Sequence, residues 1–205
     1  VSGVLEIRPL TSTGTTMSTF ASSRTFAASA AGTVGQYIPA IPYAQFIGQS
    51  DAFLSLQQVA QSALYRTNLG LVEASGQPAA VQVSVFGDAG QRLGDFDILL
   101  KPGEHMQLGV FLAQHGISVD DGRIEVAVTS STGKVTAYAS VLDNRTNDPM
   151  LILPADASKV AASRYVLPGI ADVEGAGASW RSDVRIFNAG SSETAATLTF
   201  HPQGD

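Results

Sequence analysis

The loop D-N-R-T-N-D, residues 143–148, is rich in oxygen ligands of the kind that hard cations bind. Calcium takes several carboxylate and amide oxygens at once, and the four candidate ligands are Asp143, Asn144, Asn147 and Asp148. The corresponding stretch near the N-terminus, S-S-R-T-F-A, shares only the Arg-Thr pair, at Arg24–Thr25 and Arg145–Thr146. We therefore interpret the loop as a structural corner, with calcium as the alternative, and expect no other cofactor.

The side chains that carry most enzymatic chemistry form no recognisable constellation. The three histidines, His105, His115 and His201, lack the spacing of a metal motif, and no G-x-S-x-G elbow is present. Asp95 and Asp97 alternate in a predicted strand, which is typical of a solvated strand face and not of a glycosidase cleft. The absence of cysteine excludes disulfides and thiol nucleophiles. A Ser-His-Asp triad assembled only by the fold stays open, but the sequence predicts no enzyme.

The composition of the chain limits the classes of partner that it can bind. The chain has 205 residues with a net charge of −6, and its few Lys and Arg form no basic run. Nucleic acid and anionic membrane surfaces are therefore disfavoured as partners. Hydrophobic residues make up 44% and charged residues 15%, so the chain can bury a core. No apolar run is long enough to cross a membrane, and Val1–Arg8 is typical of a strand and not of a signal peptide, so we expect any signal or anchor outside this sequence.

The clearest organisational feature is an internal similarity between Ala63–Phe86 and Ala178–His201, which align without a gap at a shift of 115 residues. Each copy reads as strand, Gly/Ser turn and strand, with alternating apolar positions. The matched pairs are Tyr65 and Trp180, Arg66 and Arg181, Leu69 and Val184, Leu71 and Ile186, Val83 and Leu198, and Val85 and Phe200. We assign the two arginines a structural role, satisfying buried carbonyls or pairing with a carboxylate between sheets.

A second similarity joins Gly3–Thr25 to Gly122–Thr146, with a shift of 119 at S-T-G and 121 at R-T. A third, shorter one relates Gln36–Ile41 to Arg164–Ile170. Together they predict a repeat of about 120 residues. Residues 1–34 then hold the closing strands of a partial repeat, residues 35–148 a complete repeat, and residues 149–205 the opening strands of a further one.

The pattern predicts an all-β fold built from antiparallel β-sandwich repeats of the immunoglobulin-like kind. Two segments, Asp51–Leu64 and Glu104–His115, have some helical periodicity and are expected as helical turns or loops. Gly87–Gly90 and Ser130–Gly133 are expected as hairpin turns. The expected strands are Gln36–Ile41, Tyr65–Val72, Ala80–Phe86, Arg92–Leu99, Arg123–Thr129 and Lys134–Leu142.

Three motifs carry a resemblance: Y-R-T-N-L-G-L-V-E-x-S-G at Tyr65–Gly76, A-Y-A-S-V-L-D-N-R-T-N-D-P at Ala137–Pro149, and S-R-T-F…G-Q-Y-I-P at Ser23–Pro39. This set resembles tandem immunoglobulin-like repeats in large secreted or surface proteins of environmental bacteria. The resemblance covers most of the chain and implies secretion or a cell-surface location, a β-sandwich and tandem display. It implies no catalytic residues, because such repeats have no established activity.

We expect a non-catalytic extracellular protein, such as a stalk, an adhesin or a filament-forming module. The two partial repeats would leave unpaired strand edges. The unpaired edges would find partners if the two ends meet within one chain, or if neighbouring chains complete each other head to tail. Alternatively, the sequence is a fragment cut out of phase from a longer protein. In the head-to-tail case the partner would be a second copy of the chain.

The alternative function is a carbohydrate- or protein-binding module, whose partner would be a glycan or a surface protein. Tyr37, Tyr43 and Phe46 are the candidates for an exposed aromatic platform. The other prominent aromatics, Tyr65, Tyr138 and Trp180, occupy repeat positions that we expect in the core.

Overall fold

The computed structural model describes residues 3–30, 32–158, 162, 164–175 and 177–202. The chain divides into two compact units, Val1–Ala161 and Ala162–Asp205, which are described separately. Every strand pairing among the described residues is antiparallel, and helix is confined to short turns. The predicted all-β, antiparallel fold class is confirmed.

The first unit contains a four-stranded sheet in the order β10-β9-β4-β7. Its central pair joins β4 to β9 over their full length, from Tyr65 opposite Asp143 to Glu73 opposite Val135. The strands are β4 (Tyr65–Glu73), β7 (His105–Leu108), β9 (Val135–Asp143) and β10 (Pro149–Ile152).

A five-stranded sheet lies against it, in the order β11-β3-β8-β5-β6. Val83 of β5 lies opposite Val126 of β8, and Val85 lies opposite Ile124. The strands are β3 (Leu54–Gln61), β5 (Ala79–Phe86), β6 (Arg92–Leu100), β8 (Val119–Val128) and β11 (Ala155–Asp156).

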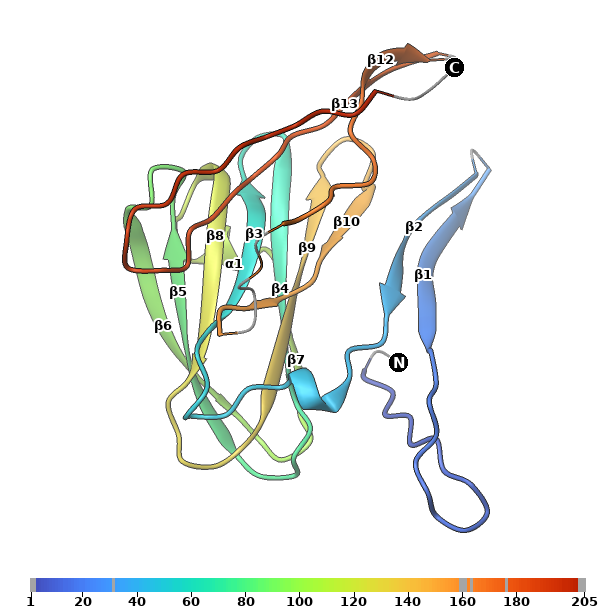
Figure 1. Ribbon diagram of the computed structural model, residues 1–205, viewed down its shortest axis with the longest axis vertical. Coiled ribbons are helices and arrows are strands. Elements are labelled where there is room, and N and C mark those ends of the chain that lie inside the picture. Colours follow the sequence, from blue (N-terminus) through green and yellow to red (C-terminus); the bar gives the residue numbers. More distant parts are fainter. Residues whose placement is uncertain (1–2, 31, 159–161, 163, 176, 203–205) are drawn as a thin grey trace. The chain divides into compact units, whose positions relative to one another are not determined.

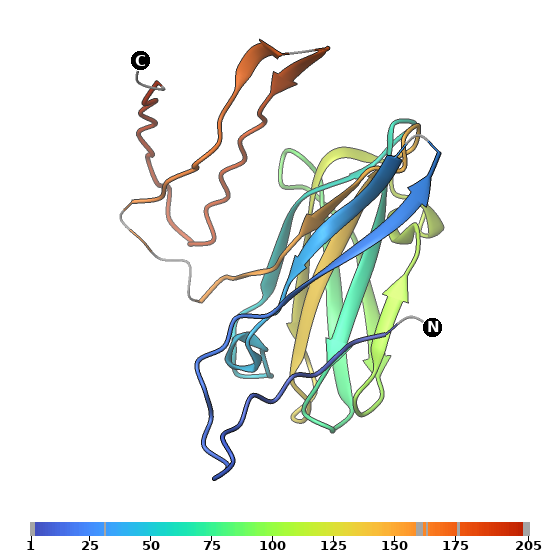
Figure 2. The same cartoon turned by 90° about the vertical axis from the view of Figure 1, so that its right-hand side faces the viewer.

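The two sheets form two layers with one apolar core between them (Figure 1; Figure 2). Alternating residues of each strand point inward, so both sheets contribute fully buried side chains. Such side chains include Leu69 and Leu71 from the four-stranded sheet and Val83, Val85 and Ile124 from the five-stranded one. Burying one of them stabilises the fold by about 1.5–3 kcal/mol. We call this body, from β3 to β11, the two-sheet core.

Connections between strands differ from the sequence-based expectation at one turn. Gly87–Gly90 joins β5 to its neighbour β6 as a hairpin, as predicted. Ser130–Gly133 instead carries the chain from β8 in one sheet to β9 in the other, so the expected hairpin is wrong. Gly133 has φ +87°, and a Cβ there would collide with Ala79, so the crossing requires glycine.

Helical periodicity was misleading at Asp51–Leu64, which forms strand β3 and not a helical turn or loop. The strand contains a bulge, with register shifts on both sides of Val59 and a positive φ of 59° at Gln58. A bulge inserts a residue and shifts the alternation of inward positions. Leu56 and Val59, on either side of the shift, are therefore three residues apart, a spacing that is also typical of a helix. Glu104–His115 contains β7 and a single helical turn, α1 (Phe111–Gln114).

The segment that precedes the two-sheet core forms a hairpin of β1 (Ser22–Ser29) and β2 (Gly32–Pro39). β2 lies beside β10, and Gln36 of β2 contacts Ser140 of β9 through a hydrogen bond of 3.2 Å (Figure 2). A 3-10 turn, η1 (Tyr43–Gln45), leads to Ile47, which is fully buried and exchanges two backbone hydrogen bonds with Val135.

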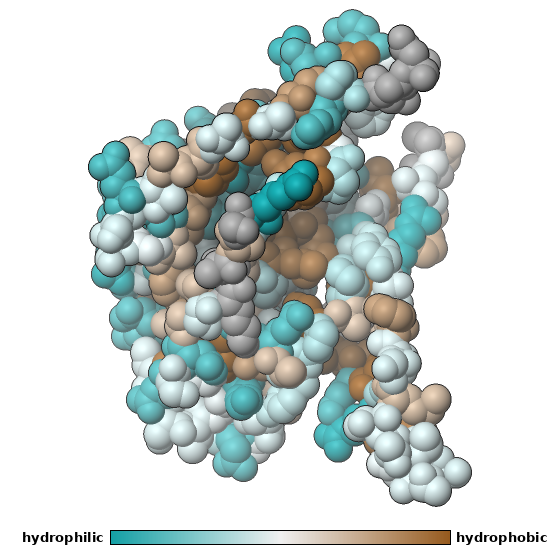
Figure 3. Space-filling view, viewed as in Figure 1, coloured by the Kyte–Doolittle hydropathy of each residue, from teal (hydrophilic) through white to brown (hydrophobic). Residues whose placement is uncertain are grey.

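The second unit contains a small exposed hairpin of β12 (Asp172–Gly175) and β13 (Ala178–Arg181). Apolar side chains reach its surface among polar ones (Figure 3). Residues 182–202 follow without further strand. Nowhere in the described ranges is there a helix with the length and apolar character that a membrane span needs.

Candidate functional site

Protein donors engage the oxygen atoms of the predicted corner loop, residues 143–148. Asp143 Oδ1 accepts hydrogen bonds from the backbone N–H groups of Arg145 and Thr146, at 2.7 and 2.8 Å. Asn144 Oδ1 and Asn147 Oδ1 each accept one from the guanidinium of Arg66, at 2.9 and 2.8 Å. The guanidinium of Arg66 therefore joins β4 to the corner loop. Its partners are two side-chain amide oxygens and not the buried carbonyls or the carboxylate that the sequence led us to expect.

This geometry matters for the calcium alternative. The backbone N–H groups of Thr146 and Arg145 hold the pKa of Asp143 below its ordinary value. A calcium ion would compete with the guanidinium of Arg66 for the oxygens of Asn144 and Asn147. No cluster of three or more His, Asp or Glu that could hold a metal occurs among the described residues. The contacts support the interpretation as a structural corner.

A buried carboxylate that sequence reasoning missed lies at the end of β4. Glu73 is 1% exposed, and its two oxygens accept hydrogen bonds from the backbone N–H groups of Ser75, Gly76, Gly103 and Lys134 and from the Ser75 hydroxyl. Burial acts to raise the pKa of Glu73, but these hydrogen bonds outweigh it and hold the pKa below its ordinary value. The carboxylate ties three separate loops together. The only sequence signal was a glutamate two residues before the Ser-Gly pair of a turn.

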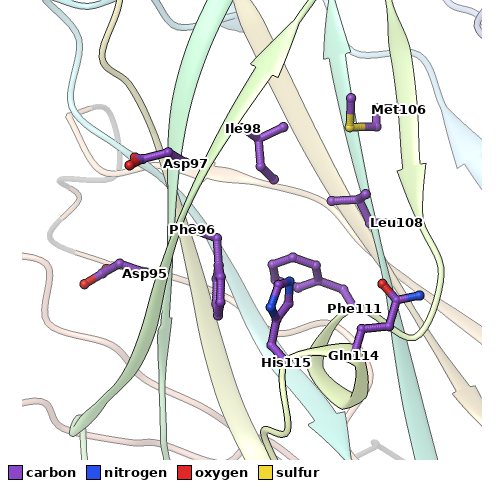
Figure 4. Close-up of a pocket in the computed structure, with 9 residues that line it drawn as sticks. All are labelled: Asp95, Phe96, Asp97, Ile98, Met106, Leu108, Phe111, Gln114 and His115. Carbon is purple, nitrogen blue, oxygen red and sulfur yellow. The ribbon is translucent and has the colours of Figure 1, made fainter.

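An open groove runs along one side of the two-sheet core, between the edge strands β6 and β7 (Figure 4). Its volume is about 370 Å³. We call it the edge groove. Its apolar lining comes from both sheets and from α1, and polar groups stand at its rim. The lining residues are Asp95, Phe96, Asp97, Ile98, Met106, Leu108, Phe111, Gln114 and His115.

The titratable groups at the edge groove do not form a catalytic pair. The His115 ring lies 3.8 Å from the centroid of Phe96 and 4.9 Å from that of Phe111, so the imidazole packs on aromatic rings (Figure 4). Asp95 accepts hydrogen bonds from Ser84 and Arg92 on the outer face of its sheet. Asp97 is exposed on that same face. The groove can therefore bind an apolar or aromatic group. The contacts described for His115 and Asp95 do not join these two side chains to each other.

The remaining histidines lie apart. His105 Nε2 is 2.9 Å from the hydroxyl of Tyr138, on the outer face of the four-stranded sheet. The Tyr138 ring crosses Gly70 of the neighbouring strand, where a Cβ would collide with it, and burial raises the pKa of Tyr138. His201 lies in the exposed stretch of the second unit. The structure therefore does not bring His105 and His115 to a common site.

The proposed aromatic platform is not a single flat surface. The rings of Tyr43 and Phe46 are 5.3 Å apart and tilted by 41°, and Phe46 is buried. Tyr37 belongs to β2, opposite Arg24. The core positions expected for the other aromatics are also wrong. Tyr138 lies on the outer face, and Tyr65 and Trp180 are exposed.

The matched copies of the strand pattern differ sharply in burial. We call Ala178–His201 the opening segment and Val4–Phe26 the closing segment. In the two-sheet core the inward positions Leu71, Val83, Val85, Ile124 and Val126 are all 0% exposed. Their counterparts in the opening segment are exposed by 65% at Ile186, 70% at Leu198 and 70% at Phe200, and those in the closing segment by 83% at Leu5 and 52% at Ile7. The same apolar pattern is thus buried in one copy and exposed in the other.

Two turns also match between the copies. Glu73 accepts a hydrogen bond from the N–H of Ser75, and its counterpart Asn188 accepts one from the N–H of Gly190 at 2.9 Å. The S-T-G turn that ends at Gly133 recurs at Gly14, which has φ +81°. Each turn therefore keeps its local geometry in a segment that lacks the surrounding sheets.

A family model described as a family of unknown function, DUF5719, matches residues 49–204. The chain belongs to this family. No curated protein and no solved structure matches the chain. The DUF5719 match begins before β3 and continues through the opening segment, so both copies of the pattern at a shift of 115 residues lie within one family unit.

Proposed function

We propose that this DUF5719 protein is a non-catalytic extracellular structural module, of the stalk, adhesin or filament-forming kind. Its closing and opening segments are the complementary parts of a further sandwich, which neighbouring chains complete head to tail. The observation that carries the proposal is the contrast in burial between matched positions. Val83 and Val85 are fully buried in the two-sheet core, whereas Leu198 and Phe200 are each 70% exposed.

Exposed apolar side chains in alternating positions support this role. An isolated strand pair with one apolar face is marginal in water, because it needs a second layer to bury that face. The opening segment has the alternation of β4 and β5 and the closing segment that of β8 and β9. Because β4 pairs with β9 and β5 pairs with β8 in the two-sheet core, each segment lacks the partner strands that the other would supply. The family unit includes the opening segment, which further supports a functional role for it.

The finer fold that we propose is a variant of the immunoglobulin-like sandwich, repeated with a period of about 120 residues. In immunoglobulin domains the last strand joins the sheet that contains the strand before it. Here β9 pairs with β4, and β8 pairs with β3 and β5. β9 therefore lies in the sheet opposite to the one that contains β8, whereas in the immunoglobulin pattern the last two strands share one sheet.

The test is the mass of the purified chain by light scattering over a concentration series, with negative-stain images of the same samples. A mass that grows with concentration, together with fibres on the grid, is expected for head-to-tail completion. A strict 21.3 kDa monomer at all concentrations would contradict the filament-forming role.

A second candidate function, a binding module for a glycan or protein, is favoured by the edge groove. The exposed imidazole of His115 and the half-buried ring of Phe96, over an apolar floor, suit a flat apolar face. A glycan and peptide binding screen tests this, with His115→Ser as the groove variant and His201→Ser as the matched control. Binding that is lost only in His115→Ser supports the candidate, and binding that is equal in both variants contradicts it.

A further inference from the structure

We propose that the edge groove binds an extended peptide segment of a partner protein. The segment adds to the free edge of β6 as an antiparallel strand and carries a basic residue opposite Asp97, between two apolar ones. This inference rests on the second candidate function, a binding module at the edge groove, and names the class of its ligand. Three features of the groove carry it: an unpaired backbone edge, an apolar floor between the sheets, and a rim carboxylate without a partner among the described residues.

The backbone of β6 forms one edge of the five-stranded sheet, beside the groove. Among the described residues β6 pairs only with β5. On β5, Ala80 turns its backbone away from β6, because its N–H donates to Ser130 Oγ and its C=O accepts from the N–H of Thr129. Facing residues of an antiparallel pair alternate between hydrogen-bonded and non-bonded positions. Ala80 is therefore at a non-bonded position with respect to β6.

The register of β5 and β6 then shows which backbone groups of β6 are free. Leu99 lies opposite Ala80, and the same non-bonded position recurs at Asp97 and Asp95 without a register shift. The N–H and C=O groups of these three residues therefore point to the open edge. Such a row is a template for an added strand, whose main-chain hydrogen bonds supply affinity.

The apolar core is incompletely covered on this side of the two-sheet core. Four half-buried apolar side chains pack against the core here and line the groove (Figure 4): Phe96 and Ile98 of β6, and Met106 and Leu108 of β7. Alternate side chains of a strand added to β6 would lie next to Phe96 and Ile98 and point into the same space. Apolar residues at those positions would remove the groove floor from water.

The rim of the groove selects a basic residue between the two apolar ones. The side chains of Asp95 and Asp97 point away from the groove floor (Figure 4). Arg92 and Ser84 engage Asp95, whereas no hydrogen bond or ion pair within the described ranges engages Asp97. A residue directly opposite Asp97 on an added strand would place its side chain beside this carboxylate. Opposite charges on facing residues stabilise a strand pair, so Lys or Arg is favoured there and Asp or Glu is disfavoured.

These features favour a peptide over a glycan. A glycan could stack on the rings of the groove, but it has no backbone ladder to match the N–H and C=O groups of the β6 edge. A peptide strand uses the edge, the floor and the carboxylate together, because its side chains alternate between the inner and the outer face.

A synthetic peptide of the alternating pattern, S-V-K-V-K-V-S, is the probe, and S-V-E-V-E-V-S is its charge-reversed counterpart. Fluorescence polarisation of the labelled peptides is expected to show binding of the lysine peptide and several-fold weaker binding of the glutamate peptide. In Asp97→Lys this preference should be reversed. Glu193→Lys makes the same change of charge in the second unit and is the matched control, which should bind as wild type does. Circular dichroism checks that both variants are folded.

The contribution of the backbone is tested separately. The lysine peptide N-methylated at both lysines keeps its side chains but cannot donate hydrogen bonds to β6. It is expected to bind about tenfold more weakly, since two hydrogen bonds are lost. Amide hydrogen exchange followed by NMR should also slow at Asp97 and Leu99 when the unmodified peptide is bound, because their N–H groups become paired.

The outcomes separate the inference from the proposed function. Equal binding of the N-methylated and unmodified peptides, or no binding of the lysine peptide, would overturn strand addition. If maltohexaose then binds wild type but not His115→Ser, the binding module stands as a glycan module and the peptide ligand alone fails. A reversed charge preference in Asp97→Lys, together with slower exchange at Asp97 and Leu99, supports both.

Discussion

Tyr138 of β9 lies across Gly70 of β4, at a position where any Cβ would occupy the space of its ring. The crossing lets the Tyr138 hydroxyl reach His105 of β7, so three adjacent strands are linked on the outer face of the four-stranded sheet. An aromatic ring over a glycine in the next strand fills the gap that the missing side chain leaves, and it pins the register of the pair.

Gly70→Ala is expected to destabilise the fold by about 1–3 kcal/mol, because the methyl group forces the Tyr138 ring out of its place. Urea unfolding followed by circular dichroism measures this. Gly109→Ala is the control, since a Cβ at Gly109 meets nothing closer than 3.8 Å. In Tyr138→Ser the space is free, so Gly70→Ala added to that background should cost much less. An equal cost in both backgrounds would contradict the packing argument.

Glu73→Gln is expected to lower stability at neutral pH by about 1–3 kcal/mol, because an amide cannot satisfy the several donors that the buried carboxylate accepts. The folded pKa of Glu73 lies below its ordinary value. Its stabilising contribution is therefore present above the unfolded pKa, near 4.3, and is lost as the pH falls through the folded pKa.

The measurement for Glu73 is the free energy of unfolding of wild type and Glu73→Gln between neutral pH and pH values below about 4. The difference between them should shrink on acidification. Glu193→Gln, an exposed change in the second unit, should match wild type at neutral pH. A difference that stays constant over the whole pH range would show that charge at Glu73 is not responsible.

Arg66→Lys is expected to cost about 1 kcal/mol, because an ammonium cannot reproduce the two-pronged contact with Asn144 and Asn147. Arg145→Lys, in the same corner loop, is the control and should unfold with wild type. Thermal unfolding of both variants measures the effect. Identical midpoints for the two would mean that the Arg66 fork contributes nothing to the corner.

Calcium is expected to leave the thermal midpoint of wild type unchanged relative to a chelator, because the amide oxygens of the corner loop already accept hydrogen bonds from Arg66. A ligand that binds only the folded state would raise the midpoint by mass action. A rise with calcium that disappears in Asp148→Asn would instead support a metal site at Asp143, Asn144, Asn147 and Asp148.

Matched substitutions at one repeat position separate folding from association. Val83→Asp is expected to abolish folding, because it buries an unpaired carboxylate at a fully buried site. Leu198→Asp, its counterpart, should leave the unfolding midpoint of the two-sheet core unchanged and weaken self-association. Circular dichroism and light scattering measure the two effects. Unchanged association in Leu198→Asp would count against the proposed function.

The alternation of apolar residues predicted several of the strands from the sequence. β4, β5, β6 and β9 lie within a residue or two of their predicted ranges, because one buried face imposes a period of two. β3 was missed, since its bulge breaks that period. The interpretation of residues 143–148 as a structural corner, based on a repeat that keeps Arg-Thr and loses the oxygens, stays a prediction.

Only the tertiary structure decided which sheet each strand joins. Local pattern cannot distinguish a hairpin turn from a crossing between layers, so Ser130–Gly133 was misread. The donors around Glu73 come from loops at residues 75–76, 103 and 134, which only folding brings together. The Tyr138–Gly70 packing and the edge groove likewise depend on neighbours distant in sequence. A sequence pattern specifies which side chains must be buried, whereas the fold specifies what buries them.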